Sequence, residues 1–220
     1  MFKSQKNVFW QAFVFTILLI GLGMVFGILL ENSRTSNIDS LYQKSEIDLM
    51  DIKLQTDIYS SGFFNCNKAQ EENINFAERI YNEAKLLDRY EKASEITDDL
   101  ISRHKKYDIL RANLLLNSIK IKEKCNSTYY DVVYIYKYNN PSLDVKAREN
   151  TFSKLLSQLK EKKGYEVLLI PMAGDNDIIS INLIKDMYNV SDKELPVVVI
   201  NGKIKITELE SLNELLKNFN

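Results

Sequence analysis

The middle of this sequence has almost no glycine and no proline. Between Ser33 and Cys125 there is one glycine, Gly62, and all three prolines lie beyond residue 130. Because glycine and proline interrupt regular structure, this scarcity predicts long helices in the middle and a domain of shorter elements near the C-terminus. The border between them is expected near residues 126–130.

A basic field and a metal-binding cluster are also missing. The 29 basic and 30 acidic residues nearly balance, and without Lys3 and Lys6 the rest of the chain carries 27 basic against 30 acidic residues. This balance excludes the electrostatic attraction expected of a nucleic-acid-binding protein. The lone His104 has no second histidine, cysteine or acidic cluster at metal spacing. We therefore expect no metal and no other cofactor, and a solvated histidine.

A long uncharged run is present near the N-terminus. At about 1.5 Å per residue, Val8–Leu30 covers about 34 Å, enough to cross a hydrocarbon core of about 30 Å once. The two preceding lysines predict a cytoplasmic tail, residues 1–7, and place the rest of the chain outside the cytoplasm. The expected location is the cell membrane. A cleaved signal peptide is the competing interpretation, but its apolar run would be shorter and no small-x-small pair follows Leu30.

Within this run, Gly23 and Gly27 form a GxxxG step. Small residues at this spacing let two membrane helices approach closely, so a homodimer through Gly23 and Gly27 is one option. Glycine is common in membrane helices, and a plain lipid-facing anchor is the favoured interpretation.

Three helices are predicted after a short polar piece, within a helical hairpin domain of residues 31–127. Apolar spacing places them at about residues 38–58, 65–90 and 97–125. The third helix carries one apolar seam with steps of three and four, formed by Tyr107, Leu110, Leu114, Ser118, Ile121 and Cys125. We expect an antiparallel hairpin, extended by the first helix into a coiled-coil-like bundle that offers a second option for dimerisation.

The two cysteines fall at the same end of that hairpin. If the chain turns near Ala93, Cys66 and Cys125 differ by only about 8 Å along the helix axes, at about 1.5 Å per residue. We therefore predict a structural Cys66–Cys125 disulfide in an oxidising compartment. A redox-active pair is the alternative, although neither cysteine belongs to a CxxC motif, the arrangement that lowers a thiol pKa.

Residues 128–220 change to shorter elements in the order β-α-β-α-β-β-α, with a parallel β-α-β start and an antiparallel hairpin at the end. Asn201-Gly202 predicts a tight turn with positive φ at both positions. Thr207 and Glu210 predict a capping box that starts the last helix. The other elements are expected at 131–136, 145–162, 166–170, 178–188, 197–200 and 203–206.

This order, with ELPVVVINGKI near its end, resembles the thioredoxin fold over residues 128–220. The resemblance implies a cis Leu195-Pro196 bond before the final hairpin. The whole chain is similar to prokaryotic single-span membrane proteins that carry a helical hairpin and a thioredoxin-like module outside the membrane. The fold class expected is therefore a thioredoxin-like α/β domain preceded by a helical hairpin and one transmembrane helix.

Active members of that family carry a CxxC pair just after the first strand, at a helix N-terminus whose dipole stabilises a thiolate. The corresponding stretch here, residues 137–144, contains no cysteine. Disulfide exchange requires sulfur as both nucleophile and leaving group, so oxidoreductase activity at this position is excluded. The chain is not expected to be an enzyme.

The resemblance still implies a peptide-binding surface. In the family the backbone before the cis-proline pairs with extended peptide, which maps onto Leu195 and Pro196. The neighbouring loop offers amides and a hydroxyl from Asn139, Asn140 and Ser142. The alternative is that Pro196 only fixes a turn.

The leading hypothesis is a membrane-anchored, non-catalytic module that binds an unfolded peptide or another protein outside the cytoplasm, or assists folding there. Two other classes stay open: a thiol-disulfide oxidoreductase that uses Cys66 and Cys125, and a structural spacer or dimerisation protein. The N-x-S/T sequons at residues 126–128 and 189–191 are interpreted as chance occurrences.

Overall fold

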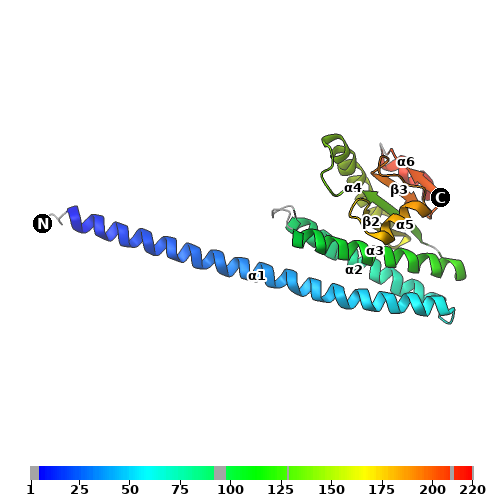
Figure 1. Cartoon of the computed structure of the whole chain (residues 1–220), viewed down its shortest axis with the longest axis horizontal. Coiled ribbons are helices and arrows are strands. Elements are labelled where there is room, and N and C mark those ends of the chain that lie inside the picture. Colours follow the sequence, from blue (N-terminus) through cyan, green and yellow to red (C-terminus); the bar gives the residue numbers. More distant parts are fainter. Residues whose placement is uncertain (1–4, 92–97, 128, 209–210, 220) are drawn as a thin grey trace. The chain divides into compact units, whose positions relative to one another are not determined.

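The computed structural model describes residues 5–91, 98–127, 129–208 and 211–219. The chain divides into two compact units, residues 1–44 and 45–220. Helix α1 (Gln5–Ser61) begins in the first unit and is continuous, so the polar piece expected after Leu30 is helical as well (Figure 1).

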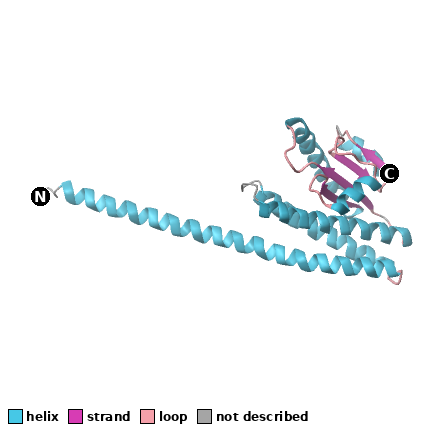
Figure 2. Ribbon diagram, in the orientation of Figure 1, coloured by secondary structure: helices cyan, strands magenta, loops and turns pink. Residues whose placement is uncertain are grey.

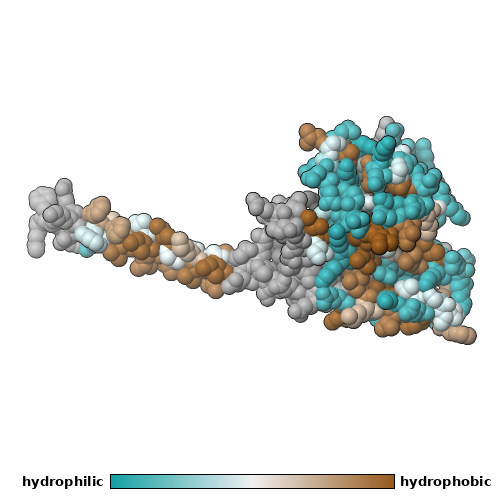
Figure 3. Space-filling model, viewed as in Figure 1, coloured by the Kyte–Doolittle hydropathy of each residue, from teal (hydrophilic) through white to brown (hydrophobic). Residues whose placement is uncertain are grey.

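The first unit contains the candidate membrane span. Phe9–Leu30 has 22 residues and is long and apolar enough to cross a membrane, and none of it is buried within the protein. Its brown, apolar surface is visible in Figure 3. Length and composition are the basis of this assignment, and a signal sequence would meet the same criteria.

In the second unit, the end of α1 packs with α2 (Cys66–Glu91) and α3 (Asp98–Lys124). Helix α1 ends at Ser61, where the sequence predicted an interruption, and Gly62 follows with φ of 77°. The six seam residues predicted on α3 are all buried. The expected turn near Ala93 lies outside the described residues.

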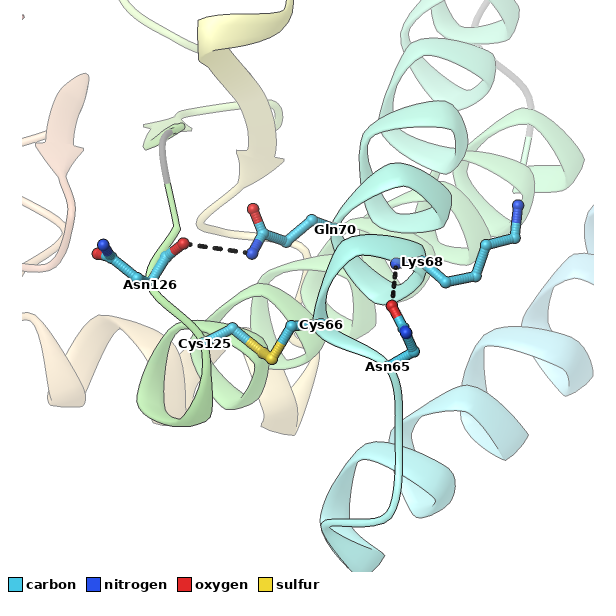
Figure 4. Close-up of a disulfide and its surroundings, with 6 residues drawn as sticks. All are labelled: Asn65, Cys66, Lys68, Gln70, Cys125 and Asn126. Carbon is cyan, nitrogen blue, oxygen red and sulfur yellow. Dashed lines mark hydrogen bonds between the residues drawn. A yellow bond between two sulfur atoms is a disulfide. The ribbon is translucent and has the colours of Figure 1, made fainter.

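The predicted disulfide is confirmed. Cys66 and Cys125 are bonded and join the first turn of α2 to the chain immediately after α3 (Figure 4). Asn65 caps α2, because its side-chain oxygen accepts a hydrogen bond from the Lys68 amide at 3.0 Å. On the other side of the disulfide, Gln70 donates to the carbonyl of Asn126 at 3.4 Å.

The rest of the second unit is built on a mixed four-stranded sheet with the order β2-β1-β3-β4 (Figure 2). Strands β1 and β2 are parallel, whereas β3 is antiparallel to both β1 and β4, as the sequence predicted for the start and the final hairpin. The strands are β1 (Tyr130–Tyr136), β2 (Val167–Ala173), β3 (Val197–Ile200) and β4 (Ile204–Ile206).

Two details of the strands follow from backbone chemistry. Strand β2 runs three residues beyond the predicted end and includes Pro171, which is tolerated because β2 is an edge strand. The β3–β4 turn has positive φ at Asn201 (49°) and Gly202 (65°), which confirms the predicted turn.

One face of the sheet is covered by α4 (Leu143–Lys163) and α6 (Leu212–Leu216), together with Phe219 of the short 3-10 segment Lys217–Phe219; another 3-10 segment, Gly164–Glu166, follows α4. Four apolar residues of α4 are buried in this core: Phe152, Leu155, Leu156 and Leu159. The mixed α/β class and the order of elements are therefore as expected.

The start of the last helix was predicted wrongly. Helix α6 begins at Leu212, and its cap is Ser211, whose hydroxyl accepts a hydrogen bond from the Glu214 amide at 3.3 Å. Ser211 and Glu214 have the same capping-box spacing as Thr207 and Glu210, so two candidate starts competed in the sequence. Leu209 and Glu210 lie outside the described residues.

Helices α3 and α5 (Ile179–Met187) lie against the sheet from the hairpin side. Near the C-terminal end of α3, Ser118 and Lys122 bind Asp131 at the start of β1. Near its N-terminal half, Asp108 accepts a hydrogen bond from the amide of Ala173 at the end of β2. Helix α3 therefore runs antiparallel to β1 and β2, and reaches from one end of these strands to the other.

Candidate functional site

The candidate site lies where β1 and β2 end, and we call it the strand-end site. It comprises the stretch 137–144, which contains the loop after β1 and the first residues of α4, together with the loop 174–177 after β2 and Leu195-Pro196 before β3. Residues 104–108 of α3 contact it from the hairpin side.

Asp175 fixes the loop after β1. Its two carboxylate oxygens accept hydrogen bonds from the amides of Tyr138 (2.7 Å) and Asn139 (2.8 Å). The side-chain amide of Asn139 donates back to the Asp175 carbonyl (2.9 Å) and to Asn176 (3.1 Å). Carboxylate-to-amide bonds of this kind are stronger than neutral ones, so the two loops are held together firmly.

The loop after β2 packs closely against the residue before the cis-proline. A Cβ atom at Gly174 would stand 2.8 Å from Cγ2 of Ile135 and 3.0 Å from Cδ1 of Leu195. A residue with a side chain would therefore displace one of these neighbours. The Gly174 amide donates to the carbonyl of Tyr136 at 2.8 Å, which continues the parallel pairing by one residue.

Asp108 joins α3 to this loop. Its side chain is fully buried, and it accepts hydrogen bonds from the Asn176 side chain (3.1 Å) and the Ala173 amide (3.3 Å). Arg111, one turn further along the helix, donates to the same carboxylate at 3.2 Å. Burial raises the pKa of the Asp108 carboxyl, while its interactions with His104 and Arg111 act in the opposite direction.

The prediction of a solvated His104 is wrong. Its side chain is 12% exposed, and its Nε2 atom forms a hydrogen bond of 2.8 Å with the Tyr136 hydroxyl. The ring also stacks on Tyr138, with centroids 4.0 Å apart. The sequence showed charged neighbours on both sides of His104, but it did not show that this face of α3 packs on the end of β1.

The five residues predicted to bind peptide separate into two groups. Asn139, Asn140 and Ser142 are exposed, and the Ser142 hydroxyl caps α4 by accepting from the Val145 amide at 3.4 Å. Leu195 and Pro196 are buried, and the bond between them is cis, as the resemblance implied.

The two groups meet at the loop after β2. Gly174 contacts the side chain of Leu195, and the next residue, Asp175, binds Asn139. The structure therefore brings both parts of the predicted surface to one loop.

Apolar side chains are exposed beside this loop. Leu143, the first residue of α4, is 89% exposed, and Ile179, the first residue of α5, is 78% exposed. Leu183 and Met187 continue the Ile179 row at steps of four residues along α5 and are also exposed. Figure 3 shows brown side chains gathered over α5.

This site offers no thiol for disulfide exchange. The stretch 137–144 has no sulfur, and the two cysteines form the disulfide at the opposite end of α3. Across the part of the chain that the structure describes, no group of three or more His, Cys, Asp and Glu side chains is arranged to hold a metal ion. Several of the loop amides and the Ser142 hydroxyl are already used in internal hydrogen bonds.

No family model, curated protein or solved structure matches this chain. The assignment of the site therefore rests on its own geometry.

Sequence reasoning missed the residues that organise the site. Asp108, Asp175 and Asn176 were not singled out, although two signals were present. Asp175-Asn176 follows a glycine a few residues after the predicted strand 166–170, and Asp108 is three residues before Arg111 on a predicted helix. A pair at this spacing is compatible with either a solvated or a buried ion pair.

Proposed function

We propose that this chain is a single-span membrane protein whose outer part is a non-catalytic, thioredoxin-like module that binds extended or unfolded polypeptide. Its N-terminus lies in the cytoplasm, and the strand-end site faces the other side of the membrane. The observation that carries this proposal is the position of Leu143 and Ile179, which are largely exposed beside an internally hydrogen-bonded loop without sulfur.

The order of the strands supports the thioredoxin-like part of the proposal. A parallel β1–β2 pair followed by the antiparallel strands β3 and β4 agrees with the parallel start and the antiparallel final hairpin expected of the element order. The location of the site has independent support, because ligands of open α/β sheets bind outside the carboxyl ends of the strands.

Binding at this site is expected to be weak and tolerant of sequence. Exposed aliphatic side chains recognise apolar surface without directional bonds, and a small contact of this kind belongs to the transient class. Specificity for unfolded chains follows, because folded proteins present few contiguous apolar segments.

Photo-cross-linking in the full chain tests this function. A photoreactive amino acid placed at Leu143 or Ile179 of the protein in lipid nanodiscs should capture a reduced, carboxymethylated polypeptide that cannot refold. The same group at Tyr165, which is 67% exposed near the start of β2, serves as the matched control and should capture at least about fivefold less.

Substitution and an activity assay complete the test. Leu143→Asp combined with Ile179→Asp should weaken binding about tenfold, the equivalent of about 1.4 kcal/mol, whereas Tyr165→Asp should leave it unchanged. Equal capture at all three positions would contradict the proposal. Turnover of a disulfide substrate that is lost in Cys66→Ser would favour the oxidoreductase alternative instead.

A further inference from the structure

The part of α1 within the second unit, residues 46–61, has apolar side chains on two faces. One face packs inside the unit: Ile52 and Tyr59 are buried, and Thr56 donates a hydrogen bond to Asn117 of α3 at 2.5 Å. The other face carries four exposed residues that we call the α1 stripe: Ile47 (69% exposed), Met50 (72%), Leu54 (62%) and Ile58 (52%).

The spacing of the stripe is that of a helix-helix seam. Its steps are three, four and four residues. In a heptad written abcdefg, Ile47 and Leu54 are then at position a and Met50 is at position d, while Ile58 follows the next position d by one residue. Ile52 and Tyr59 then fall at f positions, on the opposite side of the helix. The α1 stripe therefore points away from the hairpin, and a surface helix normally has one apolar face, not two.

We propose that the α1 stripe is a parallel dimer interface that binds the same stripe of a second copy of this chain. The helix that carries the stripe also carries the candidate span Phe9–Leu30. In every inserted copy the stripe lies on the C-terminal side of the span and is separated from it by the same number of residues. A second copy therefore presents an identical apolar seam, parallel and in register, as a two-fold interface requires.

The charges beside the stripe permit this pairing. Glu46 lies next to Ile47, and its carboxylate already forms an ion pair of 2.5 Å with Lys106 of the same chain. If a dimer brings the two Glu46 side chains close together, the Lys106 of each chain therefore compensates their negative charges. In the same register Lys53 lies at a g position beside Leu54, where coiled coils commonly carry a charge, whereas Asp57 occupies the exposed d position next to Ile58, so the continuous apolar seam runs from Ile47 to Leu54.

The size of the stripe predicts where the dimer forms. Four side chains per copy cover less than the roughly 800 Å² per partner of a stable soluble interface. Confinement of both copies to one bilayer raises their effective concentration and offsets this deficit. This inference rests on the proposed membrane anchoring and not on the proposed peptide binding.

Cysteine cross-linking of the full chain in liposomes tests the interface. Both native cysteines are held in the disulfide, so a single introduced cysteine is the free thiol in each copy. Under mild oxidation, Met50→Cys and Leu54→Cys should each give a covalent dimer in at least about half of the protein. Asn82→Cys, exposed on α2, is the matched control and should stay monomeric. Monomers at positions 50 and 54, or equal dimer at position 82, would overturn the proposal.

Energy transfer between labelled copies in liposomes separates the stripe from the span. Met50→Glu with Leu54→Glu should reduce association at least about tenfold, whereas Gly23→Leu with Gly27→Leu should leave most of it intact. The reverse result would place the contact in the span and overturn the proposal. Capture of unfolded polypeptide at Leu143, measured in the same samples, should persist in the monomeric variant, so failure of either proposal is recognised separately.

Discussion

Two buried aspartates, Asp108 and Asp131, hold α3 against opposite ends of the sheet, and they do so in different ways. Asp108 belongs to the helix and accepts hydrogen bonds from the loop after β2. Asp131 belongs to β1 and accepts from the helix, from Ser118 at 2.5 Å and from Lys122 at 2.8 Å. The Asp131 end also lies close to the disulfide, because Cys125 follows Lys122 by three residues.

Burial dominates the electrostatics at both ends. It raises the pKa of the Asp131 carboxyl and lowers the pKa of the Lys122 ammonium, in spite of the attraction between them. Neither aspartate is therefore present simply as a stabilising charge, and each serves to align the helix with the sheet. The Asp131 end lies near the covalent Cys66–Cys125 bond, whereas the Asp108 end is joined to the loop after β2 by hydrogen bonds. We expect the interface to open first at the Asp108 end, which carries the candidate site.

Asp108→Ala should have the largest effect on stability. The substitution leaves the buried Arg111 guanidinium without its carboxylate and removes the acceptor for Asn176 and the Ala173 amide. Loss of one partner of a buried pair costs about 3–5 kcal/mol. Urea unfolding of the full chain in detergent, followed by the near-ultraviolet circular dichroism of its tyrosines, measures this loss.

Asp131→Ala is the matched comparison and should cost less. The Lys122 side chain is 21% exposed and can reach water once its partner is gone, whereas that of Arg111 is 8% exposed. An equal or greater loss for Asp131→Ala would show that the two ends do not differ as we infer.

Removal of the disulfide should nearly abolish the difference between the two ends in how readily the interface between α3 and the sheet opens. The bond closes a loop with a sequence separation of 59 residues, and by loop entropy it contributes about 4 kcal/mol. Cys66→Ser with Cys125→Ser should lower the melting temperature and increase amide exchange around Tyr129 and Asp131. Exchange at the Asp108 end should change less. An unaltered melting temperature would contradict the structural role of the bond.

Gly174→Ala should have a moderate effect and should act at the Asp108 end. The new methyl group would stand 2.8 Å from Ile135 and 3.0 Å from Leu195, and overpacking of this kind costs about 1–3 kcal/mol. Gly21→Ala is the control, because no heavy atom lies within 4 Å of its Cβ position and alanine favours a helix. Equal stability of the two variants would show that the loop adjusts freely.

Local sequence patterns were sufficient for most elements of the sheet domain. The apolar run at 197–200 and the Asn201-Gly202 turn each act through their neighbours in sequence, and each was identified correctly. The disulfide was also predictable, because hairpin geometry relates two positions on paired helices.

Contacts between distant elements were not predictable in this way. The predicted seam of α3 is buried, but a second set of residues on the same helix is buried too: Asp108, Arg111, Ala112 and Leu115. A single period cannot describe a helix that packs on both the hairpin and the sheet. The positions of His104 and Asp108 depend on this second face, so the organisation of the strand-end site was missed.

The pH dependence of unfolding should reflect the two aspartates. Because burial raises both carboxyl pKa values, the folded state binds more protons than the unfolded state between the ordinary aspartate pKa and the folded values. The contribution of these two carboxyl groups to the unfolding free energy should therefore be fully present below about pH 4 and be lost as the pH rises through their folded pKa values. Asp108→Asn and Asp131→Asn should each flatten this decrease, as pH-dependent urea midpoints would show. The opposite result would be an unfolding free energy that increases with pH in the parent protein and no longer does so in either variant. It would mean that folding lowers the two carboxyl pKa values.

The smallest effect concerns Glu194, a partly exposed carboxylate beside Leu195 whose contribution to the pH dependence should be opposite in sign. Hydrogen bonds from Lys205 and from Ser191 lower its pKa to about 2, because they favour the charged form. The folded state then binds fewer protons than the unfolded state, so this group contributes stability above its ordinary pKa of 4.5 that is lost as the pH falls through about 2. Carboxyl carbon NMR should show Glu194 titrating near 2, and Lys205→Met should move its pKa back toward the ordinary value. An ordinary pKa in the parent protein would mean that the Lys205–Glu194 contact does not persist in solution.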